Sequence, residues 1–171
     1  MDQMNSALLA LPDLSAGYEV NEMYTGPITV ENTVQARGQT FADYLANVDG
    51  WTGASTSYLR SGLVEGARIR SWLITFATIE DAIAFQEHYR EISDDRKLVD
   101  MSFQPLGDNS FAVRGTPLVT GGVDTETSEI VFRELNVVGG FAMVSYRGLT
   151  DMTEFEKYAI LVYSRLNQLL R

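Results

Sequence analysis

The chain has 171 residues, of which 45% are apolar and 21% charged, and its formal net charge is −10. This composition is typical of a folded globular protein and excludes a disordered chain, and the length predicts one domain over residues 1–171. The acidic balance disfavours nucleic acid and anionic membrane surfaces as partners, and the absence of cysteine excludes disulfides, thiolate metal sites and cysteine nucleophiles.

The N-terminal residues show no targeting pattern, and residues 1–16 are a candidate peripheral segment of the domain. No positive charge precedes the apolar run at residues 7–11, which has five residues. A secretory signal needs an apolar stretch of about 7–15 residues, and a membrane span needs about 20. We therefore expect either a cytoplasmic protein or an extracytoplasmic one whose signal or lipid anchor is not part of this sequence.

Residues 18–40 show only weak signals for regular structure. A short strand is expected at residues 18–24, where aromatic and β-branched residues are frequent. Residues 25–40 are rich in Gly, Thr, Asn and Pro, which favour turns, so we expect a loop there.

The next segment predicts a pair of antiparallel strands. Residues 69–77 place Trp72 on one face and Leu73 on the other, and apolar residues on both faces indicate a central strand. Residues 51–60 are its expected partner, connected through a turn at residues 62–66.

A helix is expected from Thr78, whose hydroxyl group can cap the first turn while Glu80 and Asp81 favour the positive end of the helix dipole. The apolar spacing continues to Ile92, with one stripe facing a core. The polar pair at residues 94–95 then ends the pattern.

The second half of the chain repeats this order of elements, strands first and then a helix. The clearest signal is a hairpin of two strands with Asn136 at its turn. The adjacent glycines at residues 139–140 indicate a bulge or a close backbone contact. The hairpin strands are residues 129–135 and 137–147, weaker strands are residues 98–104 and 110–114, and residues 115–127 are expected to form a loop.

The C-terminal segment predicts the second long helix. Asp151 and Glu154 resemble a capping box, and apolar residues then recur at steps of three and four. The predicted stripe is Met152, Phe155, Ala159, Val162, Leu166 and Leu169. Taken together, these elements predict an α+β fold in which two principal helices pack on a mainly antiparallel sheet.

The titratable residues do not form a recognisable catalytic or metal-binding pattern. His88 is the only histidine and is expected on the first predicted helix, at the edge of its apolar stripe or at the surface. A metal site is not expected, because no second ligand stands at metal-binding spacing. The acidic pairs fall at helix ends or in loops, where capping and solvation explain them. We therefore expect no cofactor, no metal and no catalytic residues.

The least routine feature is a group of arginines on one predicted hairpin of an acidic protein. Arg60, Arg68 and Arg70 lie on this hairpin together with Tyr58 and Trp72. Aromatic and arginine side chains together are typical of surfaces that bind an anionic ligand or a partner protein. The alternative is a solvated strand face whose arginines pair with nearby carboxylates.

Several short stretches resemble a family of bacterial envelope proteins. Residues 11–18 (LPDLSAGY) are similar to the opening that follows the signal or lipid anchor in small envelope lipoproteins. Residues 76–82 (FATIEDA), 106–112 (LGDNSFA), 130–133 (IVFR) and 136–138 (NVV) resemble uncharacterised secreted, sensor-like domains, some related to the PsbP-like α/β/α sandwich. The resemblance implies an extracytoplasmic binding domain without catalysis, although the lipobox cysteine of such lipoproteins is missing here.

Two specific functions therefore remain open from the sequence, beside a purely structural or assembly role. The first is a non-catalytic module of the cell envelope that binds an unknown small molecule or protein, with a homodimer left open. The second is a small ferredoxin-like α+β enzyme of the monooxygenase or isomerase type, with His88, Trp72 and Tyr58 in an aromatic-lined cavity.

Overall fold

The structure is a computed structural model that describes residues 2–60, 68–115 and 125–171. Within these ranges the chain has an α+β fold with one antiparallel sheet, ordered β1-β3-β4-β8-β7-β6-β5, and β2 pairs with β3. The strands are β1 (Tyr18–Val20), β2 (Gly26–Pro27), β3 (Thr52–Arg60), β4 (Arg68–Thr75), β5 (Val99–Asp100), β6 (Asn109–Gly115), β7 (Thr125–Glu134) and β8 (Val137–Tyr146). The helices are α1 (Asp2–Ala7), α2 (Val30–Arg37), α3 (Gln39–Ala46), α4 (Ile79–Asp95) and α5 (Met152–Leu169).

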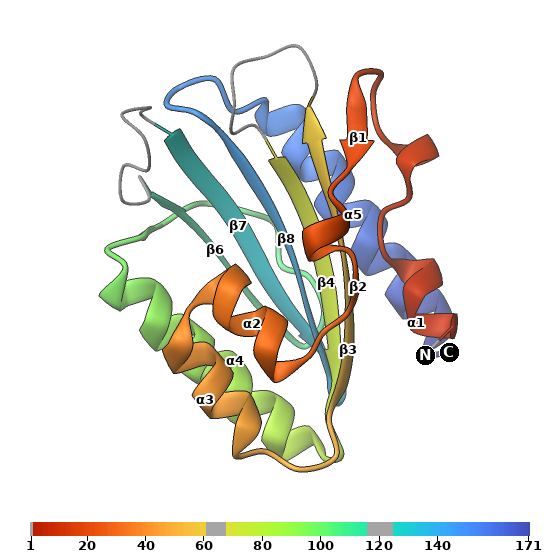
Figure 1. Cartoon of the computed structure of the whole chain (residues 1–171), viewed down its shortest axis with the longest axis vertical. Coiled ribbons are helices and arrows are strands. Elements are labelled where there is room, and N and C mark those ends of the chain that lie inside the picture. Colours follow the sequence, from red (N-terminus) through yellow and green to blue (C-terminus); the bar gives the residue numbers. More distant parts are fainter. Residues whose placement is uncertain (1, 61–67, 116–124) are drawn as a thin grey trace.

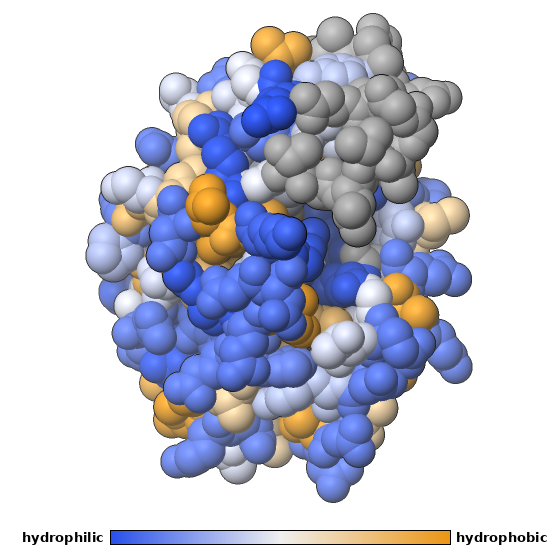
Figure 2. Space-filling view, turned by 90° about the vertical axis from the view of Figure 1, so that its left-hand side faces the viewer, coloured by the Kyte–Doolittle hydropathy of each residue, from blue (hydrophilic) through white to orange (hydrophobic). Residues whose placement is uncertain are grey.

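Helices cover both faces of the sheet, with α1 and α5 on one face and α2, α3 and α4 on the other (Figure 1). Each face has its own apolar cluster. Phe155 of α5 packs against Phe141 of β8, whereas Tyr89 of α4 stacks on Trp72 of β4. The side of the molecule that carries α3 and α4 is mostly hydrophilic at its surface (Figure 2). Among the described helices, none has the length and apolar character that crossing a membrane requires.

The strand β4 is central, as its two apolar faces predicted, because it lies between β3 and β8. Trp72 and Leu73 point to opposite faces, and both are buried. The two glycines of β8 keep a continuous register with β4 and β7, so they form no bulge. They instead permit close packing, because a Cβ atom on Gly140 would lie 2.5 Å from the Trp72 ring.

The two principal helices begin where the sequence predicted. The Thr78 hydroxyl accepts a hydrogen bond from the Asp81 amide at the start of α4, and the Asp151 carboxylate accepts from the Glu154 amide at the start of α5. Phe155 and Leu166 of the predicted α5 stripe are fully buried. Leu169 is 41% exposed and does not belong to that stripe.

The prediction of a loop at residues 25–40 is wrong, because α2 and the start of α3 occupy much of it. Thr29 and Asn32 form a reciprocal capping box that starts α2. Phe41 and Leu45 of α3 are buried beside α4. The predicted turn at residues 62–66 lies outside the described residues, as does most of the predicted loop at residues 115–127.

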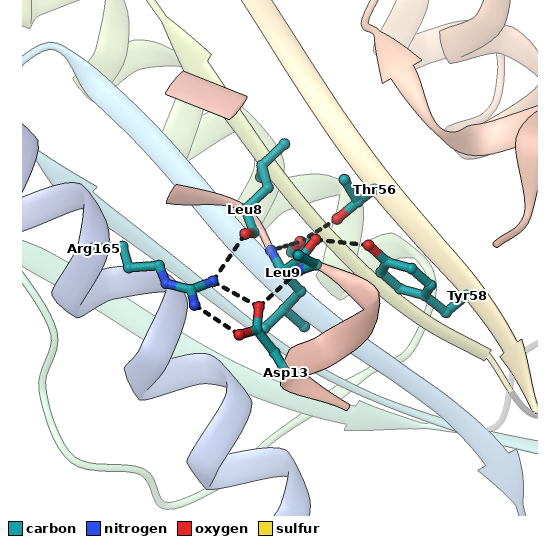
Figure 3. Close-up of polar contacts among 8 residues, drawn as sticks. Leu8, Leu9, Asp13, Thr56, Tyr58 and Arg165 are labelled. Carbon is teal, nitrogen blue, oxygen red and sulfur yellow. Dashed lines mark hydrogen bonds and ion pairs between the residues drawn. The ribbon is translucent and has the colours of Figure 1, made fainter. Parts of the chain in front are cut away.

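The N-terminal segment is fixed to the sheet and to α5 (Figure 3). Leu8 and Leu9 are 2% and 1% exposed, although the sequence suggested a peripheral segment over residues 1–16. The Tyr58 hydroxyl donates to the Leu9 carbonyl at 2.8 Å. Arg165 of α5 donates to the Leu8 carbonyl at 3.2 Å and to both Asp13 oxygens at 2.7 Å. This network attaches the start of the chain to the core.

The pair of Asp13 and Arg165 makes folding sensitive to acid. The guanidinium group of Arg165 lowers the pKa of Asp13 below its ordinary value, against an opposing effect of burial. The stabilising effect of this ion pair is therefore full above about pH 4, and it is lost as the pH falls through the lowered pKa of Asp13. Asp13→Asn is expected to lower the free energy of unfolding by about 1–2 kcal/mol at pH 7, and by less near pH 3.

Chemical denaturation at the two pH values measures this difference. Asp95→Asn removes the same charge from an exposed position of α4 and is expected to change stability by less than about 0.5 kcal/mol at either pH. An equal loss in Asp13→Asn at pH 3 and pH 7 would contradict an ion-pair origin.

Candidate functional site

The strand register places a row of small and charged side chains across the middle of the sheet. Arg70 of β4 lies opposite Ser57 of β3 and Ala142 of β8, and Ala142 lies opposite Glu129 of β7. Because alternate residues of a strand share a face, these four residues lie on the face that α2, α3 and α4 cover. The small Ala142 leaves open space between Arg70 and Glu129.

Residues from three other segments complete this space. Arg37 is the last residue of α2, Arg96 follows the end of α4, and Tyr24 ends a short 3-10 turn at Glu22–Tyr24. Together with Arg68 of β4, they line a solvent-open cavity of about 110 Å³. We call it the arginine pocket and define it by Arg37, Arg68, Arg70, Arg96, Ser57 and Glu129. Figure 2 shows a hollow with a hydrophilic rim on this side of the molecule.

Arg37 contacts two aromatic rings and a carboxylate at the wall of the pocket. Its guanidinium carbon lies 4.6 Å from the ring centre of Trp72 and 5.0 Å from that of Tyr89, within the range of cation–π attraction. Its Nη1 donates to the Tyr89 hydroxyl and lies 3.3 Å from Glu129 Oε1. The Tyr89 hydroxyl in turn donates to the same carboxylate oxygen at 2.5 Å. Glu129 therefore balances the charge of Arg37.

Burial and mutual repulsion act against the charges of the two inner arginines. Burial and the neighbouring Arg70 lower the pKa of Arg37 to about 9, against the opposing attraction of Glu129. Burial also lowers the pKa of Arg70 to about 10, with Glu129 again opposing and Arg68 adding to the effect. Both groups remain charged at neutral pH, so the pocket holds desolvated positive charge that an anion would stabilise.

Two buried donors of residues that line the pocket have no hydrogen-bond partner among the described residues. They are Arg70 Nε and Ser57 Oγ, which belong to directly opposite residues of β4 and β3. In the same described ranges, no ion pair joins Arg68, Arg70 or Arg96 to a carboxylate. Since buried polar groups normally have partners, this arrangement is typical of a site completed by a ligand.

The structure brings together some of the residues that the sequence proposed for binding and separates others. Arg68 and Arg70 line the arginine pocket, and Trp72 lies directly behind Arg37. Tyr58 is opposite Ile69 in the register and belongs to the cluster on the α5 face, so it does not line the arginine pocket. Arg60 lies 5.6 Å from the ring centre of Tyr18, outside the pocket.

Sequence reasoning missed Arg37, Arg96, Ser57 and Glu129. Arg37 was assigned to a loop, and the only local signal for its helix is the pair of Thr29 and Asn32. Glu129 was expected at the start of a hairpin strand and no role was assigned to its carboxylate, yet it is 3% exposed. Glu129 directly precedes the apolar run at residues 130–132, and this position was the available indication that its carboxylate is buried.

His88 lies away from this pocket on the outer part of α4. Its ring stacks on Tyr44 with 4.4 Å between ring centres, and its Nδ1 lies 3.4 Å from a carboxylate oxygen of Glu91. Trp72 is on the same side of the sheet and Tyr58 on the opposite side. The three residues that the enzyme hypothesis required therefore do not share one cavity.

The chain has the fold of a domain known from outside the cytoplasm. It is similar to the extracellular domain of PknH from Mycobacterium tuberculosis, with a TM-score of 0.65, 13% identity, and coverage of 98% of this chain and 96% of that one. A structure from Bacteroides thetaiotaomicron covers 65% of this chain and 43% of its own, with 9% identity and a TM-score of 0.43. No protein-family model and no curated protein matches the sequence.

Proposed function

We propose that this chain is a non-catalytic ligand-binding module of the bacterial cell envelope, with the arginine pocket as its binding site. The observation that carries the proposal is a pair of buried donors, Arg70 Nε and Ser57 Oγ, that have no partner among the described residues and belong to side chains lining a cavity open to solvent. The extracytoplasmic location is supported by the shared fold with an extracellular domain and by the resemblance of residues 11–18 to envelope lipoproteins. A lipid anchor, a protein partner and a homodimer remain predictions.

The chemistry of the pocket favours binding over catalysis. A general acid or base works best with a pKa near the operating pH, and the arginines stay protonated at neutral pH. The one carboxylate among the residues that define the pocket, Glu129, is already engaged by Arg37 and Tyr89. What these groups can do is hold and orient an oxygen-rich ligand.

Binding is tested by titrating the purified protein with small anionic, neutral and cationic compounds while its melting temperature is measured. At least one class is expected to raise the melting temperature saturably, and mass spectrometry is expected to recover that compound unchanged. No shift with any class would contradict ligand binding, and chemical conversion of a bound compound would contradict the non-catalytic assignment.

Location is tested separately with the full-length gene product in the bacterium that encodes it. We expect protease added to intact cells or spheroplasts to digest the protein while a cytoplasmic marker stays intact. Protection of the protein together with the cytoplasmic marker would overturn the envelope assignment.

A further inference from the structure

The charge of the arginine pocket restricts the ligand that it can hold. Four guanidinium groups face one carboxylate, in a protein whose formal net charge is −10. Arg37 and Glu129 balance each other, which leaves Arg68, Arg70 and Arg96 without a carboxylate partner in the described ranges. A ligand with one negative charge would offset only part of this excess, whereas a group with two charges would offset most of it.

The donors of the pocket match an oxyanion with several acceptor oxygens. Arg70 presents a planar guanidinium group whose Nε has no partner among the described residues, and Ser57 adds a hydroxyl from the neighbouring strand. Charge-assisted hydrogen bonds from arginine to phosphate or carboxylate oxygens are stronger than those between neutral groups. Arg68 and Arg96 are exposed and can approach further oxygens from the mouth of the cavity.

The size of the pocket limits what is enclosed. Its volume of about 110 Å³ is below the range of roughly 300–1,000 Å³ that is usual for pockets enclosing a drug-sized ligand. The enclosed space therefore suits one compact polyatomic group and not a whole drug-sized molecule. Because the cavity is open to solvent, the rest of a larger molecule can remain outside.

From charge, donors and size we infer that the arginine pocket binds a compact oxyanion with two negative charges, a phosphate group in free or monoester form. The inference rests on the proposed function and specifies the ligand of the same site. In the bound state the phosphate oxygens accept from Arg70 Nε and Ser57 Oγ, and Arg68 and Arg96 neutralise the charge at the mouth.

Calorimetric titrations at pH 7.5 and constant ionic strength test this assignment with three probes: inorganic phosphate, glycerol phosphate and acetate. Both phosphate compounds are expected to bind at one site, at least about tenfold more tightly than acetate. Tighter binding of inorganic phosphate would identify the free ion as the ligand. Tighter binding of glycerol phosphate would identify an esterified phosphate group.

Arg70→Gln removes the central donor and should weaken phosphate binding by about tenfold or more. Without ligand, this variant should melt at the same temperature as the wild-type protein or higher, because a desolvated and repelled charge is gone. Arg60→Gln is the matched control, since it removes the same charge from the adjacent strand outside the pocket. Its phosphate affinity should stay within about twofold of the wild-type value. If Arg70→Gln does not fold, the exposed Arg68→Gln replaces it, with an expected loss of about twofold to fivefold.

Three results would overturn the inference: acetate binding as tightly as phosphate, equal losses in Arg60→Gln and Arg70→Gln, or no binding of phosphate in either form. If phosphate fails while a neutral or cationic compound still raises the melting temperature, the proposed function stands and only the ligand class is wrong. If no compound of any class binds, both fail.

Discussion

Glu129→Ala is expected to lower the free energy of unfolding by about 3–5 kcal/mol, because it breaks a buried ion pair and leaves one partner behind. The side chains of Arg37 and Glu129 are 11% and 4% exposed. Without the carboxylate, Arg37 would remain beside the positive Arg70, and the Tyr89 hydroxyl would lose its acceptor. Such a loss is a large part of the roughly 5–15 kcal/mol that stabilises a typical domain.

A control separates the charge from the cavity that alanine creates. In Arg37→Met/Glu129→Leu, both charges are replaced by apolar groups of similar size, so neither member of this ion pair is left behind as a buried charge. This double variant should be more stable than Glu129→Ala by about 2 kcal/mol or more. Urea denaturation of the three proteins measures the difference. A loss below about 1 kcal/mol in Glu129→Ala would show that water reaches and solvates Arg37.

Gly140→Ala is expected to destabilise the protein by about 3 kcal/mol through overpacking. A Cβ atom at this position would lie 2.5 Å from Cε2 and Cζ2 of Trp72 and 2.6 Å from its Nε1. The indole has little room to move away from the added Cβ atom, because it is 1% exposed and stacks on Tyr89 with an interplanar angle of 8°. This strain exceeds the small gain that alanine normally brings to a strand.

Two further variants identify the cause of that loss. Trp72→Phe removes the indole atoms that meet the new methyl group, so Gly140→Ala should cost much less in its presence, a coupling of about 1–3 kcal/mol. Gly148→Ala tests backbone strain alone, since its φ is +77° and no atom lies within 4 Å of the added Cβ. We expect it to cost about 1–2 kcal/mol regardless of residue 72. Additive losses in the double variant would contradict overpacking against Trp72.

The parts of the fold that were predictable are those whose signal is local in the sequence. The apolar alternation around Trp72 and Leu73 predicted the central strand, and the capped, regularly spaced stripe after Asp151 predicted α5. The helix α2 was missed because it has no apolar stripe. Thr33 is its only buried residue among those whose side chains the structure describes. Its position is fixed by its caps and by the contacts of Arg37 with the core.

The candidate site was predictable only where its residues are close in sequence. Arg68 and Arg70 stood out because they are two positions apart in an acidic chain. Glu129 is 92 positions from Arg37, and their contact depends on the order of four strands and the end of a helix. Tyr58 was wrongly grouped with Arg70 because the sequence did not specify the register. With Tyr58 opposite Ile69, the two side chains face different layers.

The stacking of Arg37 on Trp72 gives the arginine pocket an intrinsic optical reporter. The chain contains two tryptophans, and only Trp72 has a guanidinium carbon 4.6 Å from its ring among the contacts that the structure describes. The other, Trp51, donates its indole N–H to the Leu45 carbonyl at 2.8 Å. Indole emission responds to the electric field across the ring, so any change in the charge beside Arg37 alters the fluorescence of Trp72. In a Trp51→Phe background, a single buried fluorophore then reports occupancy of the pocket without any attached label.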